Sequence, residues 1–163
     1  MKLTEFKVYL GLIEYLHACG WLIICASPPG GTDSRFRKCI LPRRAKGEER
    51  GLRDEVDVTA HKADTIIFIE CKSTLSDSLH IENALGESDL AKLQRLTEAF
   101  PPIQLSTLLK QASGIVLPAN PRIVTALAVG RIDCEIPDNI NVLEITKPVR
   151  IIADRQLRTI LES

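Results

Sequence analysis

The sequence predicts an α/β fold in which a central mixed β-sheet carries helices on its faces. Amphipathic stretches of helical length alternate along the 163-residue chain with short runs of apolar and β-branched residues. Their order is helix, strand, hairpin, helix, helix, strand, strand, helix, and mixed elements of this kind commonly build one sheet covered by helices. Hydrophobic residues make up 45% of the chain, which is enough for one core, so we expect a single domain over residues 1–163.

The first helix and the first strand are predicted within residues 3–26. Apolar residues recur at steps of three or four over residues 3–19, which is typical of an amphipathic helix. Gly20 stands where glycine commonly follows a helix C-terminus. The uninterrupted apolar run over residues 21–26 then predicts a short buried strand.

A long irregular segment is predicted over residues 27–50, because the run Pro28-Pro29-Gly30-Gly31 interrupts regular structure. A loop of this length inside a compact domain is usually functional or mobile. The chain as a whole has 21 basic and 21 acidic residues, but the stretch from Arg35 to Arg53 is strongly basic, with only Glu48 and Glu49 in opposition. The basic residues are Arg35, Arg37, Lys38, Arg43, Arg44, Lys46, Arg50 and Arg53.

The clearest feature of the sequence is a β-hairpin. Residues 54–60 alternate polar and apolar side chains, as a half-buried strand does. Residues 65–72 begin with β-branched and aromatic side chains, which indicates a central strand. A polar turn over residues 61–64 joins the two runs, so we expect them to pair.

The second half of the chain is predicted to be mainly helical, with two further strands. Residues 73–86 are polar and are expected to form a loop or lid. Ser88 is placed to cap a helix over residues 89–100, which Pro101 and Pro102 end. The remaining predicted elements are a helix over 103–112, strands over 123–129 and 142–145, and a helix over 154–161.

The hairpin brings chemically active side chains together. Glu70 and Lys72 are two residues apart and therefore share one face of their strand. If the turn is centred between Ala63 and Asp64, then Asp57 lies opposite Glu70, where directly opposed Cβ atoms are about 4.5–5.5 Å apart. The sequence thus predicts two carboxylates and an ammonium at one place.

Two carboxylates at that separation destabilise a strand pair unless a positive charge neutralises them. A divalent cation is the expected solution, since Mg²⁺ favours one or two carboxylates together with waters and phosphate oxygens. The main-chain carbonyl of Cys71, between Glu70 and Lys72, is a further candidate ligand. Such an ion activates a bound water and polarises a phosphoryl oxygen, while Lys72 stabilises developing charge.

The stretch DEVDVTAHKADTIIFIECKS, residues 54–73, resembles the signature of the PD-(D/E)XK nucleases. Similar motifs occur in restriction-type enzymes, archaeal Holliday-junction resolvases and CRISPR-associated nuclease domains. The resemblance implies a restriction endonuclease-like three-layer α-β-α core with a central mixed sheet of order α-β-β-β-α-β. It also implies Asp57 and Glu70 as ligands of Mg²⁺ or Mn²⁺ and Lys72 as the catalytic lysine. The usual Pro-Asp pair is replaced here by Val56-Asp57.

The resemblance extends less specifically to residues outside the hairpin. Many members add an acidic residue from the first helix, and Glu14 is our choice here, with Glu5 as its rival. Relatives often place a substrate-contacting residue on the helix after the motif, where Lys92 and Gln94 lie. The basic segment supplies candidate contacts to nucleic acid phosphates. These candidates are Arg35, Arg37, Lys38, Arg43 and Arg44.

The predicted function is therefore a Mg²⁺-dependent endonuclease that acts on nucleic acid, and we expect DNA. One alternative is a nucleic-acid-binding module of the same fold without activity. Another is an assembly subunit of a larger defence or recombination complex. No separate target-recognition domain is visible, so we expect specificity to come from a homodimer or from partner subunits.

Other classes of protein are disfavoured by composition. The longest apolar runs are far shorter than the roughly 18 residues of a membrane span. Early charges and the lack of a cleavage site argue against a signal peptide, so we expect a cytoplasmic protein without membrane contact. Five widely spaced cysteines without a CxxC pair argue against a structural zinc site.

Overall fold

A computed structural model describes residues 3–38, 40–42 and 53–162 of the chain. The helices are α1 (Glu5–Ala18), α2 (Leu75–His80), α3 (Asp89–Ala99), α4 (Pro102–Ser113) and α5 (Arg155–Glu162). The strands are β1 (Leu22–Ala26), β2 (Ile40–Pro42), β3 (Arg53–Glu55), β4 (Val58–Lys62), β5 (Thr65–Thr74), β6 (Arg122–Arg131), β7 (Val142–Glu144) and β8 (Arg150–Ile152).

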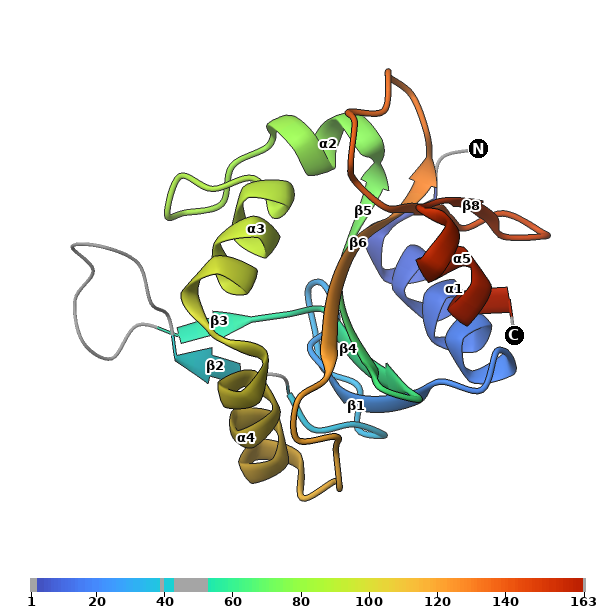
Figure 1. Cartoon of the computed structure of the whole chain (residues 1–163). Coiled ribbons are helices and arrows are strands. Elements are labelled where there is room, and N and C mark those ends of the chain that lie inside the picture. Colours follow the sequence, from blue (N-terminus) through green and yellow to red (C-terminus); the bar gives the residue numbers. More distant parts are fainter. Residues whose placement is uncertain (1–2, 39, 43–52, 163) are drawn as a thin grey trace.

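A six-stranded mixed sheet forms the centre of the protein, in the order β1-β4-β5-β6-β7-β8 (Figure 1). Strands β1, β4 and β5 pair antiparallel, whereas β5, β6 and β7 run parallel and β8 returns antiparallel. Every residue from Thr65 to Cys71 is buried. This explains the continuous apolar run in the sequence, because a central strand covered on both faces has no solvent side.

Helices cover both faces of the sheet, as the sequence predicts. Helices α1 and α5 pack on one face, where Ile67 and Ile69 of β5 belong to the same core. Helices α3 and α4 pack on the other, over Ile66 and Phe68. The alternation of β5 side chains between two cores places Glu70 and Lys72 on the α3 side.

The predicted roles of Gly20 and Ser88 at helix ends are confirmed. Gly20 follows α1 with a φ of +82°, and the start of this helix is capped by the Thr4 hydroxyl, which accepts a hydrogen bond from the Lys7 amide at 3.2 Å. The Ser88 hydroxyl caps α3 by accepting from the Ala91 amide at 3.2 Å. Among the described helices, none has the length and apolar character needed to cross a membrane.

The register of the hairpin is also confirmed. Lys62 pairs with Thr65 and Val58 pairs with Ile69, so the turn consists of Ala63 and Asp64. Ala63 adopts a φ of 52°, as two-residue hairpin turns require. Continued by one residue, this register sets Asp57 opposite Glu70.

The predicted continuous strand over residues 54–60 is wrong. Strand β3 ends at Glu55 and pairs with β2, forming a separate two-stranded ribbon, which we call the β2–β3 ribbon. Strand β4 begins only at Val58, so the chain changes sheets at Val56 and Asp57. The alternation of polar and apolar residues continues across this change, and it therefore cannot reveal that the pairing partner differs.

Three further segments differ from the prediction. The stretch predicted as irregular over residues 27–50 contains β2. The polar segment 73–86 contains α2, whose start is capped by the Thr74 hydroxyl accepting from the Asp77 amide at 3.3 Å. Strand β8 was not predicted, because three residues are too few to display a periodicity. All three elements are held by tertiary pairing or capping rather than by local pattern.

Gly130 in β6 offers a direct test of the packing between α1 and the sheet. A Cβ atom at this position would lie 2.9 Å from the Ser73 carbonyl oxygen and 3.0 Å from the Leu3 Cβ. We expect Gly130→Ala to lower the free energy of unfolding by about 1–3 kcal/mol, because overpacking forces backbone shifts. Urea denaturation measures the change. The exposed Gly31→Ala, whose Cβ meets nothing within 4 Å, is the control, and an equal effect of both variants contradicts the prediction.

Candidate functional site

Asp57 and Glu70 meet at the end of the β4–β5 hairpin. The Asp57 carboxylate accepts a hydrogen bond from the Cys71 amide at 2.8 Å. The carboxyl groups of Asp57 and Glu70 lie close enough for each to shift the pKa of the other. Glu70 is only 4% exposed, so the pair lies in a poorly solvated place. The sheet register thus brings together the two acids that the sequence predicts to be neighbours.

Two lysines face this pair. Lys92, in the first turn of α3, places its Nζ atom 2.8 Å from Glu70 Oε1 and donates to the Glu55 main-chain carbonyl. Lys72 extends from β5, on the same face as Glu70, and its side chain is 22% exposed. Lys92 is more enclosed, at 13%. Lys92 therefore acts first as an internal counter-ion, whereas Lys72 retains more access to solvent.

Two further acids surround Lys72. Its Nζ atom lies 3.5 Å from Glu5 Oε1 at the start of α1, and 4.0 Å from Asp89 Oδ2 at the start of α3. Within the described part of the chain, Asp89 Oδ2 is buried without a hydrogen-bond partner. We call Asp57, Glu70 and Asp89, together with Lys72 and Lys92, the carboxylate cluster.

The electrostatics of the carboxylate cluster show an excess of negative charge. Burial raises the pKa of Asp57 to about 6, against the opposing effect of the Cys71 amide. Burial, followed by repulsion from Asp57, holds the pKa of Glu70 well above its usual range. Burial, followed by repulsion from Glu70, raises the pKa of Asp89 to about 7. A positive charge bound beside these three acids would lower each of the raised pKa values.

The lysines stay protonated in this environment. Burial lowers the pKa of Lys72, but the nearby carboxylates of Asp89 and Glu5 outweigh it, and the net shift is upward. Burial likewise opposes the charge on Lys92, yet Glu70 raises its pKa above the ordinary value. Both side chains are therefore cations at neutral pH and cannot serve as general bases there.

The donor atoms of the carboxylate cluster suit a hard divalent cation. Its ligands would be carboxylate oxygens, which Mg²⁺ and Mn²⁺ prefer. Among the described residues, no group of three or more His, Cys, Asp or Glu side chains is arranged to hold a metal ion. The metal site predicted from the sequence needs only two such side chains, Asp57 and Glu70, together with the Cys71 main-chain oxygen. The buried Asp89 oxygen without a hydrogen bond and the raised pKa values of Asp57 and Asp89 fit an additional positive charge at this place.

The first helix contributes Glu5 and not Glu14 to this neighbourhood. Glu14 is exposed, and it lines a different hollow, of about 710 Å³, together with Trp21 and Phe36. Glu14 follows Glu5 by nine positions, which is about 13 Å along a helix. Only the N-terminal end of α1 therefore reaches the carboxylate cluster, and the choice of Glu14 made from the sequence has to be corrected to Glu5.

The predicted nucleic-acid contacts are dispersed. Arg35 forms an ion pair with Asp33 at 2.7 Å and lies over the Phe36 ring. Lys38 lies 3.8 Å from Glu55 on the β2–β3 ribbon. The Arg37 main-chain carbonyl accepts from the Ala26 amide at 2.8 Å, which ties its loop to β1. Arg43 and Arg44 lie outside the described residues.

Sequence reasoning singled out Lys92 of α3 as a candidate substrate contact but missed Asp89 and Arg95, which form one polar stripe with it. Asp89, Lys92 and Arg95 recur at steps of three and face the hairpin and the β2–β3 ribbon. Residues three apart are neighbours on a helix surface, so the stripe was detectable as a polar row beside the buried Leu93 and Leu96. Its charges resemble an ordinary solvated face, and only the tertiary structure shows that they are enclosed.

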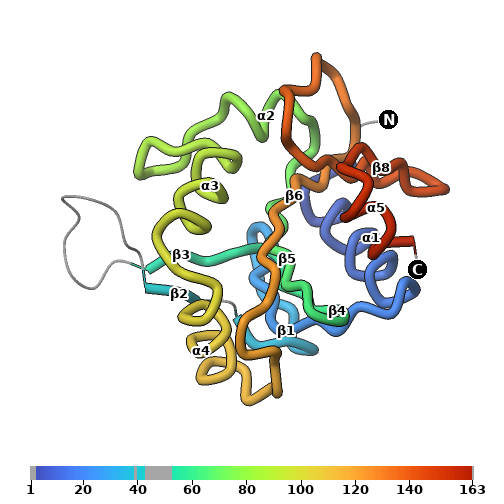
Figure 2. Tube along the Cα trace, viewed as in Figure 1, coloured from blue at the N-terminus to red at the C-terminus, as the bar shows by residue number. Residues whose placement is uncertain are grey.

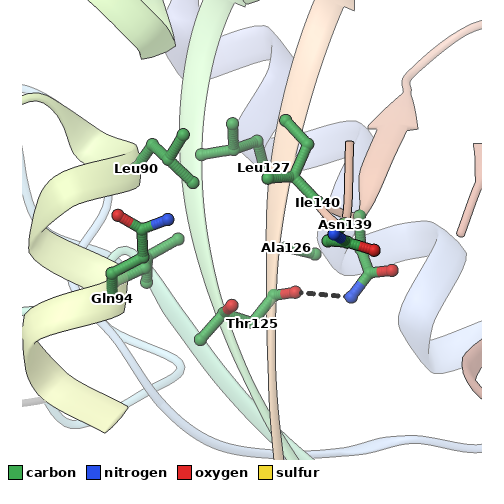
Figure 3. A pocket seen from close by; sticks show the side chains of 9 residues that line it. Leu90, Gln94, Thr125, Ala126, Leu127, Asn139 and Ile140 are labelled. Carbon is green, nitrogen blue, oxygen red and sulfur yellow. Dashed lines mark hydrogen bonds between the residues drawn. The ribbon is translucent and has the colours of Figure 1, made fainter. Parts of the chain in front are cut away.

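A small hollow lies on another side of α3 (Figure 3). Leu90 and Gln94 of α3 face Thr125 of β6 across it, and the Asn141 side chain donates to the Thr125 carbonyl at 2.9 Å. Its volume of about 60 Å³ has room for only a few water molecules. This hollow is therefore too small for a nucleotide, and the carboxylate cluster is the better candidate site.

Comparisons of the chain with protein-family models, with curated proteins and with solved structures found no match. The functional assignment therefore depends on the geometry and chemistry of the carboxylate cluster.

The raised pKa of Asp89 predicts a specific pH dependence of stability. The native protein holds this proton up to about pH 7, whereas an unfolded Asp loses it near pH 4, so stability falls as pH rises between these values. We expect Asp89→Asn to remove the part of that fall that Asp89 causes, so that the variant gains about 1–3 kcal/mol relative to the wild type between pH 4 and pH 8, while Asp57 and Glu70 keep their own contributions. Urea denaturation in the presence of EDTA at pH 4, 6 and 8 measures the free energy of unfolding of the variant and of the wild type.

The matched control is Asp138→Asn, the same change at an exposed position. Its stability profile should run parallel to that of the wild type over this pH range. A profile for Asp89→Asn that is equally parallel would show that Asp89 carries no such strain.

Proposed function

We propose that this protein is a metal-dependent endonuclease of the PD-(D/E)XK type that hydrolyses phosphodiester bonds in DNA. The observation that carries the proposal is the meeting of Asp57 and Glu70 at the end of a buried strand, with Lys72 two residues further on the same face. The succession α1, β1, β4, β5, α3, β6 supports it. This succession corresponds to the α-β-β-β-α-β order of a restriction endonuclease-like core, with β2, β3, α2 and α4 as additions.

Asp57, Glu70 and the main-chain oxygen of Cys71 would hold a Mg²⁺ or Mn²⁺ ion. The amide of Cys71 points toward Asp57. In a β-strand the N–H and C=O groups of one residue point to the same neighbouring strand, so the Cys71 carbonyl is directed to the same side. When bound, such an ion supplies a water of lowered pKa and polarises the phosphoryl oxygen.

Lys72 is the residue of the site that is best placed to contact the scissile phosphate. It is protonated, it is more exposed than Lys92, and acids on two sides, Glu5 and Asp89, hold its ammonium group near β5. A fixed cation beside the reacting group stabilises the charge that develops in the transition state. Lys92 balances the charge of Glu70 and keeps that carboxylate in place.

Positively charged side chains next to the site favour nucleic acid as the substrate. Lys38 and Arg53 are exposed at the β2–β3 ribbon. Figure 2 shows the ribbon beside α3, the helix that carries Asp89 and Lys92. Arginine and lysine bind the phosphate backbone and set the position of a protein along it. We propose that the ribbon guides DNA to the carboxylate cluster.

Replacement of the site residues tests the proposal. We expect Asp57→Ala, Glu70→Ala and Lys72→Ala each to reduce cleavage by at least about a thousandfold, because each removes a metal ligand or the transition-state cation. The assay uses labelled linear duplex, single-stranded and four-way-junction DNA, together with RNA, in Mg²⁺, in Mn²⁺ and in EDTA. Circular dichroism verifies that the variants fold.

Glu98→Gln and Lys110→Ala change the same residue types at exposed positions of α3 and α4 and should retain full activity. Cleavage that persists in EDTA, or in the triple variant at the wild-type rate, would refute the proposal. Metal-independent binding without any cleavage would instead indicate a nucleic-acid-binding module of the same fold.

A further inference from the structure

Arg95 of α3 forms an enclosed ion-pair network with two acids. Its guanidinium donates to both carboxylate oxygens of Asp54, each at 2.8 Å, and to Glu87 at 2.7 Å. Asp54 is only 4% exposed, and the Arg95 side chain is 13% exposed. Bidentate pairs of this kind are strong and directional, so the network fixes β3 against α3.

The chain from Asp54 to Asp57 is anchored at every residue. Arg95 holds the Asp54 carboxylate, and Lys92, one turn earlier on α3, donates to the Glu55 carbonyl. Val56 is fully buried, and the Asp57 carbonyl accepts from the Ser27 amide at 2.9 Å. The segment that leads into the carboxylate cluster therefore takes its position from α3 as well as from the sheet.

Asp57 depends on these anchors because it lies outside the main ladder of backbone hydrogen bonds. Strand β4 begins at Val58, so Asp57 has no strand pairing of its own with β5. Its carboxyl group also faces Glu70 in a poorly solvated place, where two negative charges repel each other. The Cys71 amide, which donates to Asp57, and Lys92, which pairs with Glu70, hold the two acids together, so the contact depends on where the chain places Asp57.

We propose that Arg95 is a positioning residue that holds the Asp57 carboxylate against β5 by clamping Asp54. Arg95 touches neither Asp57 nor Glu70 and acts through three residues of chain. This inference rests on the proposed function only in treating Asp57 as a working residue of the site. The clamp also ties the β2–β3 ribbon to the helix that carries Asp89 and Lys92.

The hydrogen bond between the Cys71 amide and Asp57 gives a direct readout of this position. Its amide hydrogen exchange can be followed by NMR in the metal-free protein, and Asp57→Ala defines the exchange rate when the acceptor is lost. We expect Arg95→Met to speed exchange at Cys71 at least about tenfold, because a hydrogen bond to a charged acceptor is loosened. Amides in the centre of the sheet, such as Ile67 and Ala126, should keep their rates.

Further variants separate positioning from general stability. Asp54→Asn should reproduce the effect, and the double variant should exchange no faster than Arg95→Met alone, because both changes break one clamp. Arg95→Lys should restore protection only in part, since lysine cannot make the bidentate contact. Arg122→Met, which removes a remote ion pair with Asp154, is the matched control and should leave the Cys71 rate unchanged.

Unchanged exchange at Cys71 in both Arg95→Met and Asp54→Asn would overturn the proposal. A uniform increase at Cys71, Ile67 and Ala126 would overturn it too, because it would show global destabilisation alone. The result is independent of catalysis: if the wild-type protein cuts no substrate with any metal, the proposed function fails while the exchange pattern still decides the role of Arg95.

Discussion

The hydrogen bond from the Cys71 amide to the Asp57 carboxylate joins the two parts of this protein on which its site depends. On one side is β5, the buried central strand that carries Glu70 and Lys72. On the other is the point where the chain leaves the β2–β3 ribbon and enters the main sheet. Without this contact, Asp57 would be an acid in a connecting segment, and Glu70 would be a buried carboxylate paired with Lys92 alone. With this contact, the fold places the carboxyl groups of Asp57 and Glu70 side by side at the buried central strand.

Such an arrangement is electrostatically costly and is only partly compensated within the protein. Glu5 lies beside the carboxylate cluster, so four acids share two lysines in the described part of the chain. The consequence is visible in the raised pKa values of Asp57 and Asp89 and in the buried Asp89 oxygen without a hydrogen bond. Groups held in an unfavourable state are typical of functional sites, because a substrate or cofactor completes the charge balance. The oxygen-rich donor set and the exposed cation of Lys72 both fit phosphodiester chemistry in the presence of a divalent ion.

Local patterns predicted the core of the site, and tertiary contacts determined the rest. The hairpin register follows from a two-residue turn and two strand periodicities, so the approach of Asp57 to Glu70 was readable from the sequence. The end of β3 at Glu55 was not, because the alternation of side chains continues while the pairing partner changes. Glu5 and Glu14 both flank the apolar stripe of α1, and only the placement of that helix on the sheet separates them. From the sequence, Asp89 and Arg95 resemble a solvated helix face, and only the tertiary structure sets Asp89 beside Lys72 of β5 and Arg95 against Asp54 of the ribbon.

Binding of a divalent cation between Asp57 and Glu70 is the central claim, and a crystal grown with Mn²⁺ tests it most directly. Anomalous diffraction at the manganese absorption edge locates the ion without any assumption about activity. The account predicts one strong peak in contact with Asp57, Glu70 and the Cys71 carbonyl, and loss of that peak in Glu70→Gln crystals. A cluster without a peak at saturating Mn²⁺, with Lys92 still paired to Glu70, would contradict it.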